Sequence, residues 1–192
     1  MSDAASQLPP PIRLVVWSDN GLDLLRSANT PLMTDHLGGP ESEERLLARN
    51  ARYAAMSARP AAEGRMFKIV LDGRGEEAGT VGFWPHTGAD GPVYETGYGI
   101  LPEFRGRGLA VAALRAVVAE ARAAGGARTL HAYPSVDHTA SNAVCRRAGF
   151  TLAGELDFEY PPGTWLRSND WWTDLCPVGG PGDEDGGRPG AG

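Results

Sequence analysis

A strand, a sharp turn and a helix follow one another from Tyr94 to Gly126, and this succession constrains the fold more than any other part of the chain. Tyr98, Ile100 and Leu101 favour a strand, which Pro102 ends because it has no N–H to donate to a ladder. The letters RGRG then form the turn, and apolar residues at helical spacing follow it. The first turn of a helix must therefore lie directly beyond the end of a strand.

The start of this helix is suited to binding an anion. The first amides of a helix have no partners within the helix, and the helix dipole adds partial positive charge there. Gly106 and Gly108 allow close approach to the backbone because they have no Cβ, and Arg105 and Arg107 add full positive charge. We expect a phosphate or pyrophosphate at this turn.

Length and composition predict one folded domain. Of the 192 residues, 42% are hydrophobic and 22% are charged, and we expect a single domain over residues 12–175 between disordered segments at 1–11 and 176–192. A net charge of −6 argues against a nucleic-acid partner. The chain has no apolar run of about 18 residues and no secretion-signal pattern, so we expect no membrane partner and a cytoplasmic location. Cys145 and Cys176 lack metal-ligand spacing, so we expect no metal.

The rest of the chain alternates between strand and helix patterns, without internal repeats. Apolar runs bounded by glycine or proline predict strands, and amphipathic stretches with acidic starts or glycine ends predict helices. The predicted strands are 12–17, 65–71, 78–84, 95–101, 128–133, 150–153 and 164–175, the predicted helices are 22–27, 40–59, 108–124 and 139–147, and residues 31–40 and 85–92 are predicted loops.

This order of elements resembles the GNAT superfamily of N-acetyltransferases over roughly residues 12–175. The family pattern of Arg or Gln, two residues, Gly, one residue, and Gly or Ala is met by Arg105, Gly108 and Ala110, and a late helix ends in Gly149-Phe150 as in the family. The resemblance implies an α/β (α+β) fold with a mixed, mostly antiparallel sheet of about seven strands and about four helices. In such a sheet the fourth and fifth strands splay apart, and acyl-CoA inserts between them.

The resemblance also implies acetyl-CoA as the cosubstrate. The amides from Arg105 to Ala110 would hold its pyrophosphate, and an amide of the segment 99–101 would polarise the thioester carbonyl. His138 stands where family members often carry an asparagine that helps to hold the cofactor. The implied cofactor-binding residues are Ile100, Leu101, Arg105, Gly106, Arg107, Gly108, Leu109, Ala110, His138 and Ser141.

Catalysis of acetyl transfer needs a base for the amine, and a proton for the departing thiolate makes that step easier. Glu95 is the candidate base, because resembling enzymes often carry a carboxylate on this strand; its alternative role is a solvated residue on an outer face. Cys145 stands where many members carry an acidic tyrosine. The proton could come from Cys145, Ser141 or water, or no acid is needed, and a buried Cys145 would simply be a small core residue.

The chain is therefore expected to be an N-acetyltransferase that moves acetyl directly onto a primary amine of a small molecule or peptide in a ternary complex. Its acidic balance favours a cationic acceptor, bound by segments 29–60, 84–92 and 158–164. The alternative is a sensor or scaffold that binds acyl-CoA without transferring it. A dinucleotide site is disfavoured because Val111 replaces the third glycine. An edge strand near the C-terminus offers a surface for a homodimer. Four tryptophans and three tyrosines are open to either a core or a pocket role: Trp84, Trp165, Trp171, Trp172, Tyr98, Tyr133 and Tyr160.

Overall fold

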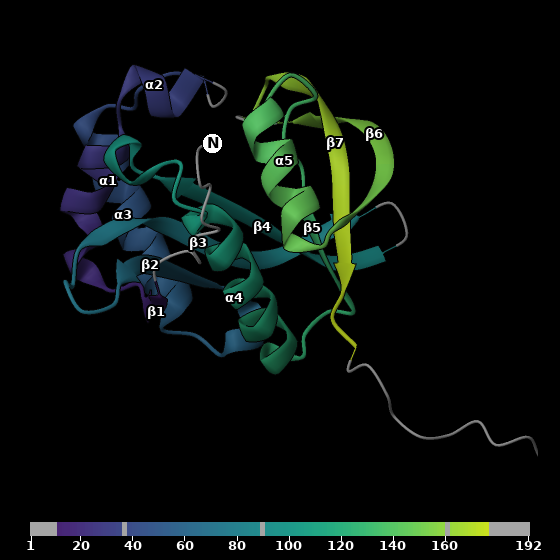
Figure 1. Ribbon diagram of the computed structural model, residues 1–192, viewed down its shortest axis with the longest axis horizontal. Coiled ribbons are helices and arrows are strands. Elements are labelled where there is room, and N and C mark those ends of the chain that lie inside the picture. Colours follow the sequence, from purple (N-terminus) through teal and green to yellow (C-terminus); the bar gives the residue numbers. More distant parts are fainter. Residues whose placement is uncertain (1–10, 36–37, 89–90, 160–161, 177–192) are drawn as a thin grey trace, which may run out of the picture.

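The computed structural model describes residues 11–35, 38–88, 91–159 and 162–176, and these form one seven-stranded sheet with helices on both faces (Figure 1). The strand order is β1-β2-β3-β4-β5-β7-β6, and all neighbours are antiparallel except β4 and β5, which are parallel. The strands are β1 Ile12–Val16, β2 Arg65–Leu71, β3 Glu77–Gly88, β4 Gly91–Ile100, β5 Thr129–Ala132, β6 Thr151–Glu159 and β7 Trp165–Asp174. The α-helices are α1 Leu22–Ala28, α2 Pro31–Thr34, α3 Glu43–Ser57, α4 Leu109–Ala124 and α5 Thr139–Ala148.

The predicted mixed, mostly antiparallel sheet is confirmed, and most of the predicted helix ends lie within a few residues of the observed ends. The N-cap of α3 is Ser42, whose hydroxyl accepts a hydrogen bond from the Arg45 N–H at 3.4 Å. Helix α4 ends at Gly125 and α5 ends at Gly149, both in the left-handed conformation that glycine adopts without strain. The expected disordered segments at 1–11 and 176–192 lie almost entirely outside the described residues.

Three local predictions are wrong. Residues 31–40 are not all loop, because Pro31 begins the short helix α2, where its missing N–H costs nothing. Of the loop predicted at 85–92, residues 85–88 and 91–92 are strand instead, because β3 continues to Gly88 and β4 begins at Gly91; residues 89–90 lie outside the described part. Pro85 is tolerated there because β2 ends opposite Phe83, so β3 has no second partner to bond. The strand predicted at 150–153 continues to Glu159 as β6.

Two hydrophobic cores lie on opposite faces of the sheet. The larger core packs α4 and α5 against the strands, and its fully buried members include Phe83, Tyr94, Leu114 and Leu130. The smaller core packs α1 and α3 against the other face and includes Trp17. The sheet is therefore the middle of three layers. An opening between two of its strands would connect the face covered by α4 and α5 with the face covered by α1 and α3.

Such a passage begins where β4 and β5 separate. These parallel strands pair only at Tyr94 with Leu130 and at Glu95 with His131, although β4 continues for five more residues. Tyr94 and Leu130 point into the larger core, so Glu95 and His131 point to the opposite face. The expected splay between the fourth and fifth strands is thus present, with Glu95 at its closed end.

Candidate active site

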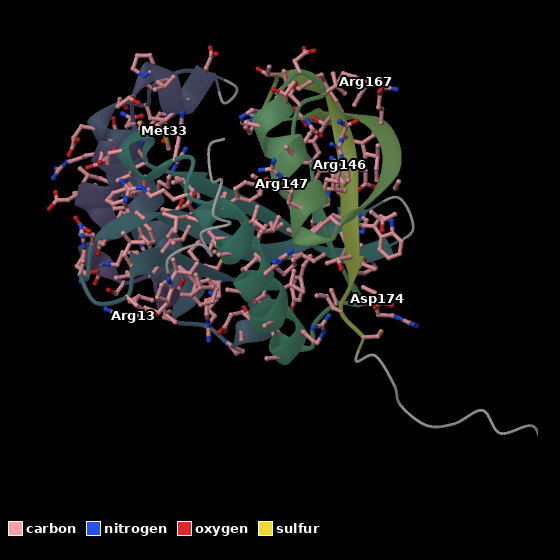
Figure 2. All side chains as sticks on the ribbon, in the orientation of Figure 1. Arg13, Met33, Arg146, Arg147, Arg167 and Asp174 are labelled. Atoms are coloured by element: carbon pink, nitrogen blue, oxygen red, sulfur yellow. The ribbon has the colours of Figure 1, made fainter. Side chains whose placement is uncertain are left out.

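A large cleft follows the gap between β4 and β5 and reaches both faces of the sheet. Its volume is about 2140 Å³, well above the roughly 300–1,000 Å³ of a pocket for one small ligand. Met33 and Tyr53 line it on the side of α2 and α3, and Gly108 and Ser141 line it on the side of α4 and α5. Met33 and Arg147 mark its two sides in Figure 2. The cleft is thus larger than one small ligand requires, and residues from both faces of the sheet line it.

The turn before α4 has the geometry predicted for an anion site. Gly106 and Gly108 have φ of 76° and 75°, values that side chains rarely adopt. The first bond of the helix runs from the Ala112 N–H to the Gly108 carbonyl at 3.1 Å, so the preceding amides have no partner within the helix. Gly106, Gly108, Leu109 and Ala110 all line the cleft.

The two arginines of the turn point in different directions. Arg105 lines the cleft, and its Nε donates to the Ile100 carbonyl at 3.2 Å. Arg107 is not among the lining residues; its guanidinium donates to the Glu103 carbonyl at 2.9 Å and lies over the Phe104 ring. Arg105 is therefore the better placed of the two to meet a phosphate.

Of the other predicted cofactor residues, some line the cleft and one is buried in the core. Ile100, His138 and Ser141 line the cleft, and His138 is the N-cap residue of α5. Leu101 is 4% exposed and packs in the smaller core, so only its backbone is available to a ligand. The structure thus brings most of the predicted set to one wall of the cleft, and it turns Arg107 and the Leu101 side chain away.

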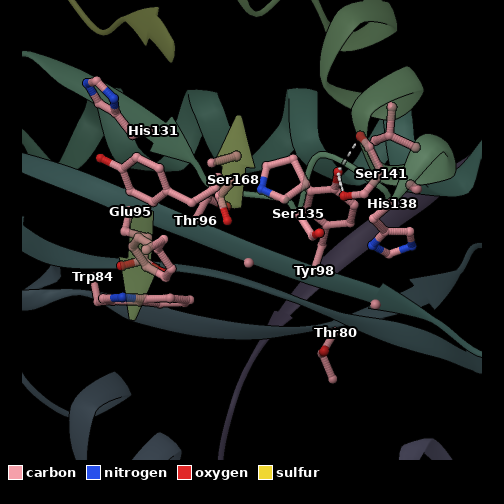
Figure 3. A pocket seen from close by; sticks show the side chains of 18 of the residues that line it. Thr80, Trp84, Glu95, Thr96, Tyr98, His131, Ser135, His138, Ser141 and Ser168 are labelled. Carbon is pink, nitrogen blue, oxygen red and sulfur yellow. Dashed lines mark hydrogen bonds between the residues drawn. The ribbon is translucent and has the colours of Figure 1, made fainter. Parts of the chain in front are cut away.

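Glu95 lies on the opposite side of the opening from the turn, on the face that α1 and α3 cover (Figure 3). Its side chain is 15% exposed and lines the cleft. Burial raises the pKa of this carboxyl from 4.5 to about 7, and a hydrogen bond from Trp84 opposes the rise. A carboxyl that titrates near neutral pH is suited to take and release protons.

A hydroxyl pair occupies the other face of the opening. The Tyr98 hydroxyl lies 2.8 Å from the Ser141 hydroxyl and 3.1 Å from the Ser141 carbonyl (Figure 3). Burial raises the pKa of Tyr98 well above its ordinary value, so the phenol stays protonated and is available as a donor. Tyr98 and Ser141 both line the cleft.

Cys145 lies behind this pair. Its side chain is fully buried, its sulfur is 3.5 Å from the Tyr98 hydroxyl, and it is not among the residues that line the cleft. Burial raises the pKa of the thiol to about 11. This position fits the core role that the sequence also allowed for Cys145.

A buried histidine–aspartate pair that sequence reasoning missed lies beside Glu95. His131 is the register partner of Glu95, and its Nδ1 is 2.7 Å from the Asp170 carboxylate while its Nε2 is 3.2 Å from the Thr129 hydroxyl. Both side chains are less than 20% exposed and line the cleft. The sequence signal was weak, because Asp170 comes from β7 and joins His131 only through the sheet order.

Asn142 is a second residue that sequence reasoning missed. Its amide donates to the carbonyls of Ser135 and His138 at 2.9 Å, and its oxygen accepts from Asn169 and from the Trp171 indole. This buried side chain ties the first turn of α5 to β7 and so fixes where Ser141 stands. Nothing in the sequence distinguished it from other polar residues on that helix.

Aromatic side chains surround the side of the cleft where Glu95 lies. Trp84 pairs with Glu95 across the sheet, and Gly97 makes room for its indole, since a Cβ at Gly97 would lie 2.9 Å from the ring. His86, Tyr133 and Phe158 form a cluster of rings whose centroids are 4.7–5.9 Å apart. Trp165 and Trp172 also line the cleft, Trp171 is core, and Tyr160 lies outside the described residues.

Within the part of the chain that the structure describes, no three His, Cys, Asp or Glu side chains gather so as to hold a metal ion. In the same part, no helix is both long and apolar enough to span a bilayer.

Comparison with known proteins gives this geometry a family. The sequence pattern of the acetyltransferase (GNAT) domain matches residues 12–151. No curated protein matches the sequence significantly. Many solved structures share the fold at low identity.

Three of these structures are acetyltransferases. An acetyltransferase of Salmonella typhimurium that modifies the N-terminal serine of ribosomal protein L7/L12 has a TM-score of 0.69 and 22% identity, over 85% of this chain and 94% of its own. The microcin C7 self-immunity acetyltransferase MccE, in complex with acetyl-CoA and AMP, has a TM-score of 0.69 and 19% identity, over 85% and 92%. A chimera of the spermidine N-acetyltransferase SpeG from Vibrio cholerae has a TM-score of 0.68 and 14% identity, over 85% and 95%.

The family pattern covers most of the chain, including the turn at Gly108 and the start of α5. The open sheet and the unpartnered amides before α4 are the structural counterpart of that match. This chain belongs to the GNAT acetyltransferase family.

Proposed function

We propose that this protein transfers the acetyl group of acetyl-CoA to a primary amine by direct attack within a ternary complex. The observation that carries the proposal is the division of one cleft into two chemically different sides. Unpartnered amides and Arg105 lie on the face of α4, and a buried carboxyl, Glu95, lies on the other face. The first side fits the phosphates of a nucleotide cofactor, and the second fits an amine.

The residues of the turn fit the pyrophosphate of acetyl-CoA. The amides of Leu109 and Ala110 would donate to its oxygens, Gly108 would let it come close to the backbone, and Arg105 would balance its charge. Beyond Glu95 the edge of β4 that faces β5 has no strand partner among the described residues, so its backbone groups, apart from the Ile100 carbonyl that Arg105 contacts, would be available to orient the pantetheine arm and the thioester. When bound, acetyl-CoA supplies the activated acyl group.

Glu95 would act as the base. An amine enters as its ammonium form, so the carboxylate removes one proton before the nitrogen attacks the thioester carbon. The raised pKa of Glu95 makes it a stronger base than an exposed carboxylate, because a desolvated carboxylate gains more from binding a proton. A base in this position contributes about 10²–10⁴-fold, and the positioning of two substrates supplies much of the rest.

Ser141 would give a proton to the departing sulfur on the other face. The second proton that the nitrogen loses would replace it, and Tyr98, whose hydroxyl lies 2.8 Å away, would hold the Ser141 hydroxyl in place. Cys145, which the sequence suggested as a donor, contacts Tyr98 from behind and would support the pair without touching substrate.

We place this reaction in the cytoplasm, as expected from the sequence.

The acceptor side favours a cationic amine with an apolar or aromatic neighbour. Glu95 and Asp170 supply negative charge, and Trp84, Tyr133 and Phe158 supply ring surface. The structural relatives act on a peptide N-terminus or on spermidine, which marks the range of amines to test first.

The proposal is tested by incubating the protein with acetyl-CoA and a panel of peptide, polyamine and arylalkylamine acceptors, and measuring free thiol together with acetylated product. Release of thiol that depends on the amine supports transfer. Cys145 replaces the family's acidic tyrosine and is buried, so a sensor that binds acyl-CoA without transferring it is the second candidate function. Binding of acetyl-CoA without thiol release on any acceptor would favour that sensor.

A further inference from the structure

His86 lies next to the candidate base and is more exposed than the base itself. Its Nδ1 is 3.2 Å from Oε2 of Glu95, and the two side chains are 31% and 15% exposed. His86 comes from β3, two residues beyond Trp84, which is the register partner of Glu95. The imidazole therefore lies between a buried carboxyl and the open part of the cleft.

Acetylation of an ammonium group leaves one proton to be disposed of in every turnover. The nitrogen enters with three protons and leaves with one in the amide, so it gives up two. One of these protons balances the proton that the departing sulfur takes up. The other remains on the Glu95 carboxyl and must leave before the next cycle, because a protonated base cannot accept again.

We propose that His86 is the exit for this proton. The O–H bond at Oε2 of Glu95 breaks as an N–H bond forms at Nδ1 of His86, and Nε2 then releases its own proton to water. Exchange with water restores the starting tautomer. His86 acts through Glu95, so it is a positioning residue, and its role rests on the proposed function.

His131, the other histidine beside Glu95, has other partners for both of its ring nitrogens. Its Nδ1 contacts Asp170 at 2.7 Å and its Nε2 contacts the Thr129 hydroxyl at 3.2 Å, so neither nitrogen is available to the carboxyl. The His86 ring packs beside the stacked rings of Tyr133 and Phe158, with centroids 5.4 and 5.9 Å away. These rings orient the imidazole without using its nitrogens.

The charges around His86 also suit a relay. His131 and Asp170 are the titratable groups that act on it from β5 and β7, and Glu95 faces it from β4. Burial, followed by the charge of His131, lowers the pKa of His86, while Asp170 opposes this change. The imidazole is therefore mostly neutral near pH 7. It can accept a proton from Glu95, and its lowered pKa favours release of that proton to water.

The test is the kinetics of His86→Ala with an acceptor that the wild type acetylates. The variant should complete a first turnover of about one product per enzyme and then slow by about tenfold or more, because Glu95 stays protonated. Added imidazole should restore the slow phase, measured as acetylated amine by mass spectrometry so that acetylimidazole is not counted. The double variant His86→Ala/Glu95→Gln should show neither the burst nor the rescue.

A purely structural role for His86 would lower both phases together and would not respond to imidazole. That result, or an unchanged steady-state rate, would overturn the relay. If His86→Ala does not fold, His86→Asn keeps a polar side chain of similar size and should show the same burst. Failure of the proposed function itself is distinguishable, since the wild type would then release no thiol with any amine.

Discussion

Replacing Glu95 with glutamine should change how the stability of the protein depends on pH. The pKa of Glu95 rises from 4.5 to about 7 on folding, so the folded state holds a proton that the unfolded chain releases between these values. The wild type therefore loses stability as pH rises through this window, and it regains this stability as pH falls. Glutamine is neutral at every pH and removes this dependence.

The size of the effect follows from the shift. About 2.5 pKa units at about 1.36 kcal/mol each give roughly 3 kcal/mol, and little of this is screened because the side chain is only 15% exposed. The free energy of unfolding of Glu95→Gln, minus that of the wild type, should thus be about 3 kcal/mol larger at about pH 8.5 than at about pH 4. Titrating groups that do not contact Glu95 cancel in the difference.

Urea unfolding at both pH values measures this quantity. Glu120→Gln is the matched control, because Glu120 is an exposed carboxylate on α4 and keeps its water in both states. A difference for Glu95→Gln that stays constant with pH would refute the claim that Glu95 is desolvated, and with it the reason for expecting a neutral-pH base. Transfer activity supplies an independent check: kcat/KM should rise with pH through about 7, and the variant should lose about 10²–10⁴-fold.

Three further substitutions probe the two sides of the cleft. Gly108→Asp should abolish the rise in Tm that acetyl-CoA produces, because its carboxylate would repel the phosphates. Neutral Gly108→Asn, which also tolerates left-handed backbone, adds a Cβ but no charge and should keep part of that rise. Tyr98→Phe should lower kcat by about 2- to 10-fold, because Ser141 loses its hydrogen bond to the phenol. The double variant with Ser141→Ala should be little slower than Ser141→Ala alone. Fully additive effects would show that the two hydroxyls act independently. Gly97→Ala should raise KM for the amine more than for acetyl-CoA, since the new Cβ displaces the Trp84 indole, and equal changes in both KM values would contradict this.

The turn before α4 could be predicted from local chemistry in the sequence. Gly106 and Gly108 were expected to let an anion approach the backbone, and both also have positive φ. The helix that follows ends at a glycine, as its pattern required. Such features depend on residues that are neighbours in the chain, so the sequence contains the relevant interactions.

Strand lengths were harder to predict because partners decide them. Pro85 and Pro92 suggested a loop, yet each lies in the extended β3–β4 hairpin, opposite Tyr94 and Thr87. A proline breaks a strand only where a neighbour needs its N–H, and the sequence does not say where the neighbouring strand ends.

The catalytic side of the cleft depended still more on tertiary structure. The sequence alone determined a helix start that can hold a phosphate and a family pattern around it, because these are local. Only the folded chain placed Tyr98 against Ser141, His86 against Glu95, and Asp170 against His131. These pairs join residues up to 43 positions apart on different strands and helices. The burial that raises the pKa of Glu95 likewise depends on how β4 and β5 pack in the folded sheet.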